Sequence, residues 1–178
     1  MRALVVYESM YGNTHVVADR IAAGIREGAE AKVISVHGVD PVDVARADLI
    51  VVGGPTHVHG MSSATSRKSA AADPGKLAES ELTLEPDSQG PGLRDWFETL
   101  GPLTNRKAAA FDTRIDMAAM LTGRASKAIA RRMRSHGMDL IAPPESFLVD
   151  RASHLVPGEA ERAEDWGRSL AARMKLPV

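Results

Sequence analysis

The chain has 178 residues, of which 44% are apolar, and a formal net charge of −1. This is enough apolar material for the core of one globular domain, and so small a charge gives no reason to expect binding to nucleic acid or to an anionic membrane. The absence of cysteine excludes disulfides, thiolate metal sites and a cysteine nucleophile. Because no apolar run could span a bilayer and Met1-Arg2 leads directly into an apolar run, we expect a cytoplasmic protein without a signal peptide or a membrane span.

Short apolar runs alternate with segments of helical spacing along the chain. The first half predicts a strand at residues 3–7, a helix over 14–28, a strand at 31–36 and a strand at 49–52 that Gly53-Gly54-Pro55 ends. The second half predicts a helix over 93–100, a strand at 107–111, a helix over 125–133, a strand region at 139–149 interrupted by Pro143-Pro144, and a helix over 160–174.

This alternation predicts an α/β fold with a doubly wound, five-stranded parallel sheet in the order 2-1-3-4-5, covered by helices on both faces, in a single domain over residues 1–178. Ligands bind outside the carboxyl ends of such a sheet, so the loops at 8–14, 54–61 and 112–123 are expected to form the site. Residues 62–92 are rich in Ser, Ala, Gly, Pro and acidic residues and are predicted to be an insertion after the third strand. It is either a solvated loop, or a lid or partner-docking segment beside the site.

The first of these loops has the composition of a phosphate site. Ser9-Met10-Tyr11-Gly12-Asn13-Thr14 follows a strand and opens a helix, so backbone N–H groups and the positive end of the helix dipole converge there. The loop has no lysine or arginine, so it is not a Walker A loop, and its single glycine does not make a G-x-G-x-x-G turn. Hydroxyls, the Asn13 amide and backbone N–H groups would hold the phosphate. The alternative is an ordinary helix N-cap.

Two segments resemble the flavodoxin family. Residues 9–14 resemble the signature Ser/Thr-x-Thr/Tyr-Gly-Asn-Thr that grips the phosphate of FMN, and residues 53–61 are similar to the Gly-x-Pro-Thr loop beside the flavin ring. The resemblance implies a flavodoxin-like fold with non-covalently bound FMN. It assigns the phosphate to Ser9, Met10, Tyr11, Gly12, Asn13 and Thr14. It assigns the ring to Pro55, Thr56, His57, Val58, His59 and Gly60 from the second loop and to Asp112, Thr113 and Arg114 from the third.

The chain departs from flavodoxins that shuttle single electrons in two respects. Its second and third loops contain no Trp, Tyr or Phe to enclose the ring, and it is nearly neutral where such proteins are strongly acidic. A cation such as Arg114 beside the ring raises the two-electron potential. Our hypothesis is that the bound FMN acts as a two-electron or weakly coupled centre.

These observations favour an FMN-binding redox protein that exchanges electrons with a redox partner protein or a small-molecule acceptor. No catalytic acid or base can be named, and His57 and His59 lack a third ligand for a metal site. Two alternatives stay open. One is an FMN-dependent oxidoreductase acting on a quinone or porphyrin-like substrate, and the other is an interaction module with weak or lost FMN binding.

Overall fold

The computed structural model describes residues 1–57, 60–63, 85 and 90–176. The strands are β1 Arg2–Tyr7, β2 Glu30–Ser35, β3 Leu49–His57, β4 Gly60–Met61, β5 Lys107–Ile115, β6 Asp139–Leu140 and β7 Glu145–Val149. The helices are α1 Asn13–Arg26, α2 Pro41–Arg46, α5 Leu93–Thr99, α6 Ala119–Thr122, α7 Ala125–Ser135 and α8 Glu159–Met174, with a short 3-10 turn, η1, at Val36–Gly38.

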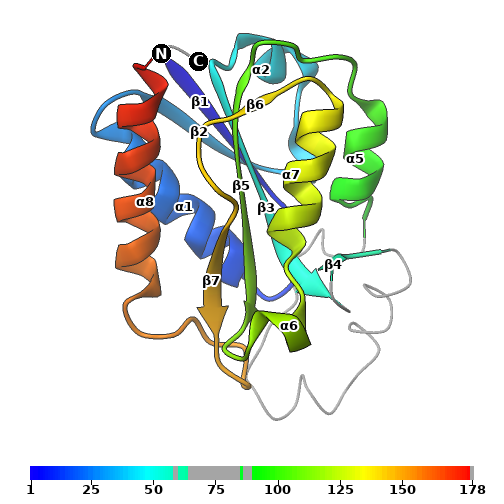
Figure 1. Cartoon of the computed structure of the whole chain (residues 1–178), viewed down its shortest axis with the longest axis vertical. Coiled ribbons are helices and arrows are strands. Elements are labelled where there is room, and N and C mark those ends of the chain that lie inside the picture. Colours follow the sequence, from blue (N-terminus) through cyan, green and yellow to red (C-terminus); the bar gives the residue numbers. More distant parts are fainter. Residues whose placement is uncertain (58–59, 64–84, 86–89, 177–178) are drawn as a thin grey trace.

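The predicted sheet order is confirmed. The sheet runs β2-β1-β3-β5-β6 in parallel, which corresponds to 2-1-3-4-5 in the predicted numbering. The fifth position is divided between β6 and β7, both of which pair with β5, because Pro143 and Pro144 interrupt the chain between them. β1, β3, β5 and β7 are parallel, so their carboxyl ends all point toward the lower side of the molecule in Figure 1.

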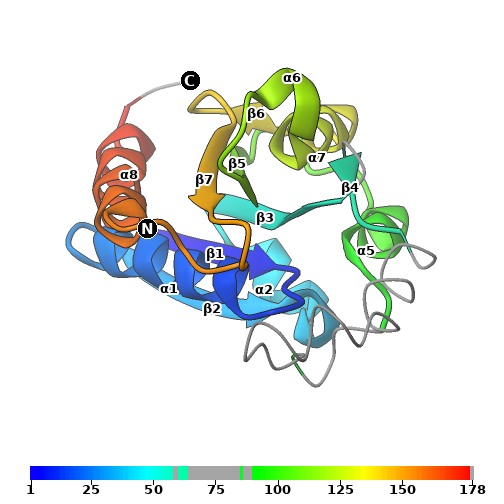
Figure 2. The ribbon, with the colours of Figure 1, turned by 90° about the horizontal axis from the view of Figure 1, so that it is seen from below.

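Helices cover both faces of the sheet, as predicted (Figure 2). On one face α1 and α8 pack over a core that includes Val5, Val51 and Phe111. Their crossing is close enough to require glycine, because a Cβ at Gly24 or Gly167 would overlap the backbone of the opposite helix. The other face packs against α2, α5 and α7 through residues of the second core, which has Phe97, Ile129 and Met133 at its centre.

Two strands extend beyond their predicted ends. The prediction that Gly53-Gly54-Pro55 ends the third strand is wrong, because these residues continue β3 and pair with Phe111, Asp112 and Thr113 of β5. Pairing between β3 and β1 stops at Gly53, so Pro55 lies where one edge of β3 is open, a position that tolerates proline. Asp112, Thr113 and Arg114 therefore belong to a strand and not to a loop.

The segment predicted as an insertion, 62–92, lies mostly outside the described residues. Its interpretation as a solvated loop, a lid or a docking segment therefore stays a prediction. Its two ends are joined by the buried carboxylate of Glu8, which accepts hydrogen bonds from Ser62 Oγ and from the backbone N–H of Leu93 (2.9 Å). The Arg94 side chain reinforces this junction by donating to the carbonyls of Ser62 and Met61. Within the part of the chain that is described, no helix is long and apolar enough to cross a membrane.

Candidate functional site

The loop between β1 and α1 presents an open helix N-terminus. Gly12, the N-cap of α1, has a left-handed backbone (φ 87°), and its N–H donates to Ser9 Oγ at 3.1 Å. No side chain caps α1 and no acidic residue lies in its first turn. The first N–H groups of a 14-residue helix, together with its dipole, are thus left to a ligand. This is the arrangement that binds a phosphate.

This helix end opens into a cavity of about 310 Å³ at the carboxyl edge of the sheet. The described residues that line it are Ser9, Met10, Tyr11, Asn13, Thr14, Pro55, Thr56, His57, Thr113, Arg114, Ile115, Val149 and Ser153. Ten of these are residues that the sequence assigned to the cofactor. The structure therefore brings the predicted phosphate loop together with the ends of β3 and β5.

The phosphate loop is joined to the end of β5 by a buried pair of hydroxyls. Thr14 Oγ1 and Thr113 Oγ1 lie 2.8 Å apart, and both side chains are buried. Since a hydroxyl both donates and accepts, either one of the pair retains capacity to bond a ligand in the cavity. The pair also fixes the first turn of α1 against the sheet.

Two predicted ring residues also have a structural task, which is to cap α7. Thr56 Oγ1 accepts the N–H of Ala125 at 3.0 Å, and Asp112 Oδ2 accepts the N–H of Ser126 at 2.7 Å. Thr56 still lines the cavity, whereas the fully buried Asp112 is directed toward α7 and lies behind the lining. Successive strand residues face opposite sides, so Thr113 faces α1 while Asp112 faces α7.

Arg114 supplies the only formal charge among the described residues that line the cavity. Its Nη1 donates to the carbonyls of Met117 (2.6 Å) and Ile115 (3.3 Å). Its Nε is buried and has no hydrogen-bond partner within the described chain. A fixed guanidinium with an unsatisfied buried N–H is suited to an electron-rich ligand atom in the cavity.

The remaining predicted residues lie elsewhere or outside the description. Gly12 lies within the phosphate loop, between lining residues. Gly60, in β4, borders a different hollow. Val58 and His59 lie outside the described residues. Among the described part of the chain, no three His, Asp or Glu side chains are grouped to hold a metal ion.

Sequence reasoning missed the contribution of β7 and the turn after it. Val149 and Ser153 line the cavity, and the Ser153 carbonyl accepts Asn13 Nδ2 at 2.5 Å. The signal was available in the topology: in the predicted order the fifth strand lies beside the fourth, so its carboxyl end lies next to Arg114.

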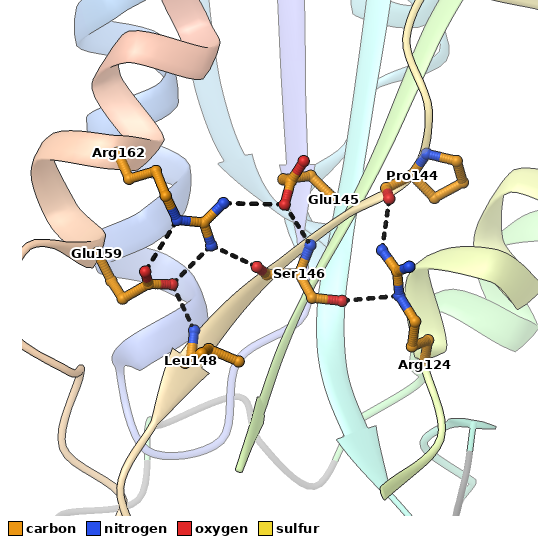
Figure 3. A network of polar contacts seen from close by, with 7 residues as sticks. All are labelled: Arg124, Pro144, Glu145, Ser146, Leu148, Glu159 and Arg162. Atoms are coloured by element: carbon orange, nitrogen blue, oxygen red, sulfur yellow. Dashed lines mark hydrogen bonds and ion pairs between the residues drawn. The ribbon is translucent and has the colours of Figure 1, made fainter. Parts of the chain in front are cut away.

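Side chains on both sides hold β7 in place (Figure 3). Glu159 of α8 accepts the Leu148 N–H at 2.7 Å, and Arg162 donates to the Ser146 carbonyl, so an ion pair satisfies the outer edge of this strand. Burial by itself raises the pKa of Glu159. The hydrogen bonds from Arg162 and Leu148 and the charge of Arg162 outweigh it, so the pKa lies below its ordinary value. From the α7 side, Arg124 donates to Ser146 Oγ (3.0 Å) and the Pro144 carbonyl (2.6 Å).

Comparison with known families decides the assignment. The family model described as Flavodoxin matches residues 5–111, which include the phosphate loop, the whole of β3 and the first part of β5 up to Phe111. The chain belongs to the flavodoxin family. No curated protein matches its sequence.

Solved flavodoxins share the fold of this flavodoxin along its whole length. A flavodoxin from the domain Archaea is 23% identical with a TM-score of 0.66, covering 99% of this chain and 100% of its own. Flavodoxin 1 from Bacillus cereus is 20% identical with a TM-score of 0.65, again covering 99% and 100%. A flavodoxin, WrbA-like protein from Agrobacterium tumefaciens is 17% identical with a TM-score of 0.60, covering 98% and 97%.

Flavodoxins are FMN-binding electron-transfer proteins, so FMN is the cofactor of this flavodoxin as well. The cavity fits that cofactor on its own chemistry. The uncapped helix end and the hydroxyls suit a phosphate without a cationic side chain, and the unsatisfied Nε of Arg114, which also lines the cavity, suits a polar ring edge.

Proposed function

We propose that this flavodoxin carries electrons between a donor and an acceptor through FMN held in the cavity between the phosphate loop and the ends of β3, β5 and β7. The supporting observation is the uncapped N-terminus of α1 opening into a cavity lined with hydroxyls. FMN supplies the redox chemistry when bound, and the protein supplies binding, orientation and electrostatics. We place this activity in the cytoplasm, consistent with a chain that has no cysteine.

Each wall of the cavity has a task in this proposal. Ser9 to Thr14 bind the phosphate through backbone N–H groups and hydroxyls. Pro55, Thr56 and His57 lie along one side of the ring, and Thr113 and Arg114 lie along the other. The hydrogen bonds of Thr56 and Asp112 to the start of α7 keep both strand ends rigid, so the ring would be held by strands instead of by free loops.

We further propose that Arg114 makes FMN a two-electron or weakly coupled centre in this protein. Its positive charge favours the more negatively charged, fully reduced cofactor. The residues from β3 and β5 that line the cavity include His57 but no Trp, Tyr or Phe. Ring stacking that would separate the two one-electron potentials is therefore weak on these two walls.

A second candidate function is direct reduction of an apolar acceptor such as a quinone. Large apolar side chains are exposed at the rim of the cavity after β5, namely Ile115, Met117, Met120 and Leu121, with Met120 92% exposed. An exposed apolar patch of this kind marks a contact surface for a ligand or partner. Its position beside Arg114 would bring an apolar acceptor to the ring edge.

The proposal is tested on the purified protein. We expect a yellow preparation, saturable FMN uptake at micromolar levels, and reductive titration that consumes two electrons without a populated one-electron stage. Two well-separated potentials with a very negative second step would overturn the two-electron proposal. Turnover of a quinone with NAD(P)H would favour the oxidoreductase over the carrier, and no saturable FMN uptake would overturn both and leave the interaction module.

A further inference from the structure

A second hollow, of about 430 Å³, lies on the opposite side of the β3–β4 hairpin from the FMN cavity. Its described lining residues are Gly60, Met61, Arg94, Arg124, Ala128, Arg131, Arg132 and Ser135. It shares none of them with the FMN cavity. The two are nevertheless neighbours, because Thr56 and His57 of that cavity pair with Met61 and Gly60. In Figure 1 the hollow's elements, β4, α5 and α7, lie together on one side of the sheet.

Half of the lining residues are arginines, and none is acidic. Two of these arginines are fixed by neutral acceptors. Arg94 donates to the carbonyls of Ser62 (2.8 Å) and Met61 (3.0 Å), and Arg124 donates to Ser146 Oγ and the Pro144 carbonyl. Within the described residues only Nε and Nη2 of each are used, and Nη1 has no partner there. Each guanidinium is therefore oriented before any ligand arrives, and no described carboxylate cancels its charge.

Two arginines elsewhere in the chain are neutralised by carboxylates. Arg162 pairs with Glu159 and Glu145, and Arg168 pairs with Glu27, Glu164 and Asp165. By contrast, none of the arginines of the hollow has an ion-pair partner within the described chain. Among the described residues the hollow is thus a concentration of positive charge without a paired carboxylate, on a protein whose net charge is −1.

The outer surface of α7 adds to this charge. Arg131 and Arg132 are exposed at the hollow, and Lys127 and Arg134 are exposed on the same helix, which contains no acidic residue. The side chains of Arg131 and Arg132 have no hydrogen-bond partner among the described residues. Their side chains can therefore reorient to contact a ligand that Arg94 and Arg124 already hold.

We propose that this hollow binds a phosphorylated small molecule, with the four arginines as its phosphate receptors. Planar guanidinium forks bind phosphate oxygens in pairs, and several of them converge here. The volume lies within the range of small-molecule sites. A nicotinamide dinucleotide carries such phosphate groups in its diphosphate and, in NADPH, its 2′-phosphate, and this site lies beside the FMN cavity. Free pyrophosphate presents the same phosphate oxygens to the arginines.

The test is binding by isothermal titration calorimetry to the full-length protein, with FMN and without it. The probes are pyrophosphate, ADP, NADPH and NADH, with adenosine as the uncharged control. We expect saturable binding of the phosphate-bearing probes that weakens with added salt, and none of adenosine. Binding of pyrophosphate alone would identify a site for free phosphate. Binding of ADP and of both dinucleotides would identify a site for a nucleotide diphosphate. Tighter binding of NADPH than of NADH would identify a site for the 2′-phosphate.

Variants show whether the hollow is the site. Arg131→Gln and Arg132→Gln should each raise the Kd about tenfold or more, because each removes a charge-assisted contact. Arg134→Gln removes the same charge from the same helix outside the hollow, and should change the Kd by less than about threefold.

Equal effects of all three variants, or no saturable binding of any phosphate probe at low salt, would overturn the proposal. Binding of a polyglutamate peptide in place of every phosphate probe would also overturn it, in favour of docking by an acidic protein. The sites share no lining residue, so failure here leaves FMN binding intact, and failure to bind FMN leaves this test interpretable.

Discussion

Gly12→Ala tests whether the shape of the phosphate loop controls FMN affinity. Gly12 has φ 87° and ψ −21°, a left-handed conformation that costs a residue with a Cβ about 1–2 kcal/mol. The new methyl group would meet nothing closer than Glu85 Oε1 at 3.8 Å, which is ordinary contact. The whole perturbation is therefore backbone strain at the loop whose N–H groups face the cavity.

The strain has two ways to appear. If the loop keeps its shape, the free energy of unfolding falls by about 1–2 kcal/mol and the Kd for FMN is unchanged. If the loop relaxes in the free protein, binding must restore the shape, and the Kd rises about 5- to 30-fold. The sum of the two losses should be about 1–2 kcal/mol. Urea unfolding of the FMN-free protein and FMN fluorescence titration measure the two terms separately.

Gly158→Ala is the matched control. Gly158 is the N-cap of α8, has nearly the same backbone (φ 89°, ψ −14°), and a Cβ there would meet nothing within 4 Å. It does not line the FMN cavity. The control should lose similar stability with no change in Kd. The reasoning is refuted if Gly12→Ala changes neither quantity, or if Gly158→Ala raises the Kd equally.

Three further predictions concern the helix crossing, the α8 ion pair and the ring-side cation. Gly167→Ala forces a methyl group into the carbonyl of Ile21, so we expect the free energy of unfolding, measured by chemical denaturation, to fall by about 1–3 kcal/mol. An unchanged denaturation midpoint would show that α1 and α8 can move apart without cost. Glu159→Gln should cost about 1–3 kcal/mol at neutral pH by weakening the pair with Arg162. Because the folded pKa of Glu159 lies below the ordinary 4.5, its contribution is present above that pH and is lost as the pH falls through the lowered value. The difference between wild type and variant should therefore narrow in acid, and a constant difference in unfolding experiments would contradict this. Arg114→Gln should lower the two-electron potential of bound FMN by roughly tens of mV in a redox titration, where about 30 mV corresponds to 1.4 kcal/mol. A rise of this potential would show that the charge of Arg114 does not stabilise the reduced cofactor.

Periodicity was enough to predict the strands and the long helices, because each buries a regular set of apolar residues, and their alternation indicated the doubly wound sheet. The helix from Asn13 and the strand of Val5 and Val6 are examples, as their burial follows the spacing of their apolar residues. The ends of strands were harder to predict, because they depend on partners distant in sequence. Gly53 continues β3 since the Phe111 ring lies over it, in space that a Cβ would fill.

The motif identified most of the cavity but not the direction of each side chain. Asp112 and Thr113 were predicted together, yet only Thr113 faces the phosphate loop, because neighbours on a strand point to opposite faces. The β4 hairpin and the four-residue helix α6 were not predicted, since neither is long enough to show a period. The edge contacts of Glu159 and Arg162 with β7 depend on tertiary structure alone.

The contacts of Glu8 suggest that the chain between Ser62 and Leu93 can be replaced by a different sequence. The Glu8 carboxylate binds both Ser62, at the start of the long segment, and Leu93, directly after it, so these two points of the chain stay adjacent whatever residues connect them. Loop-closure entropy grows only with the logarithm of the number of residues enclosed, so a shorter or longer connection between these two anchored residues should change the free energy of folding little. The length of this connection can thus vary without any change in the order of the strands.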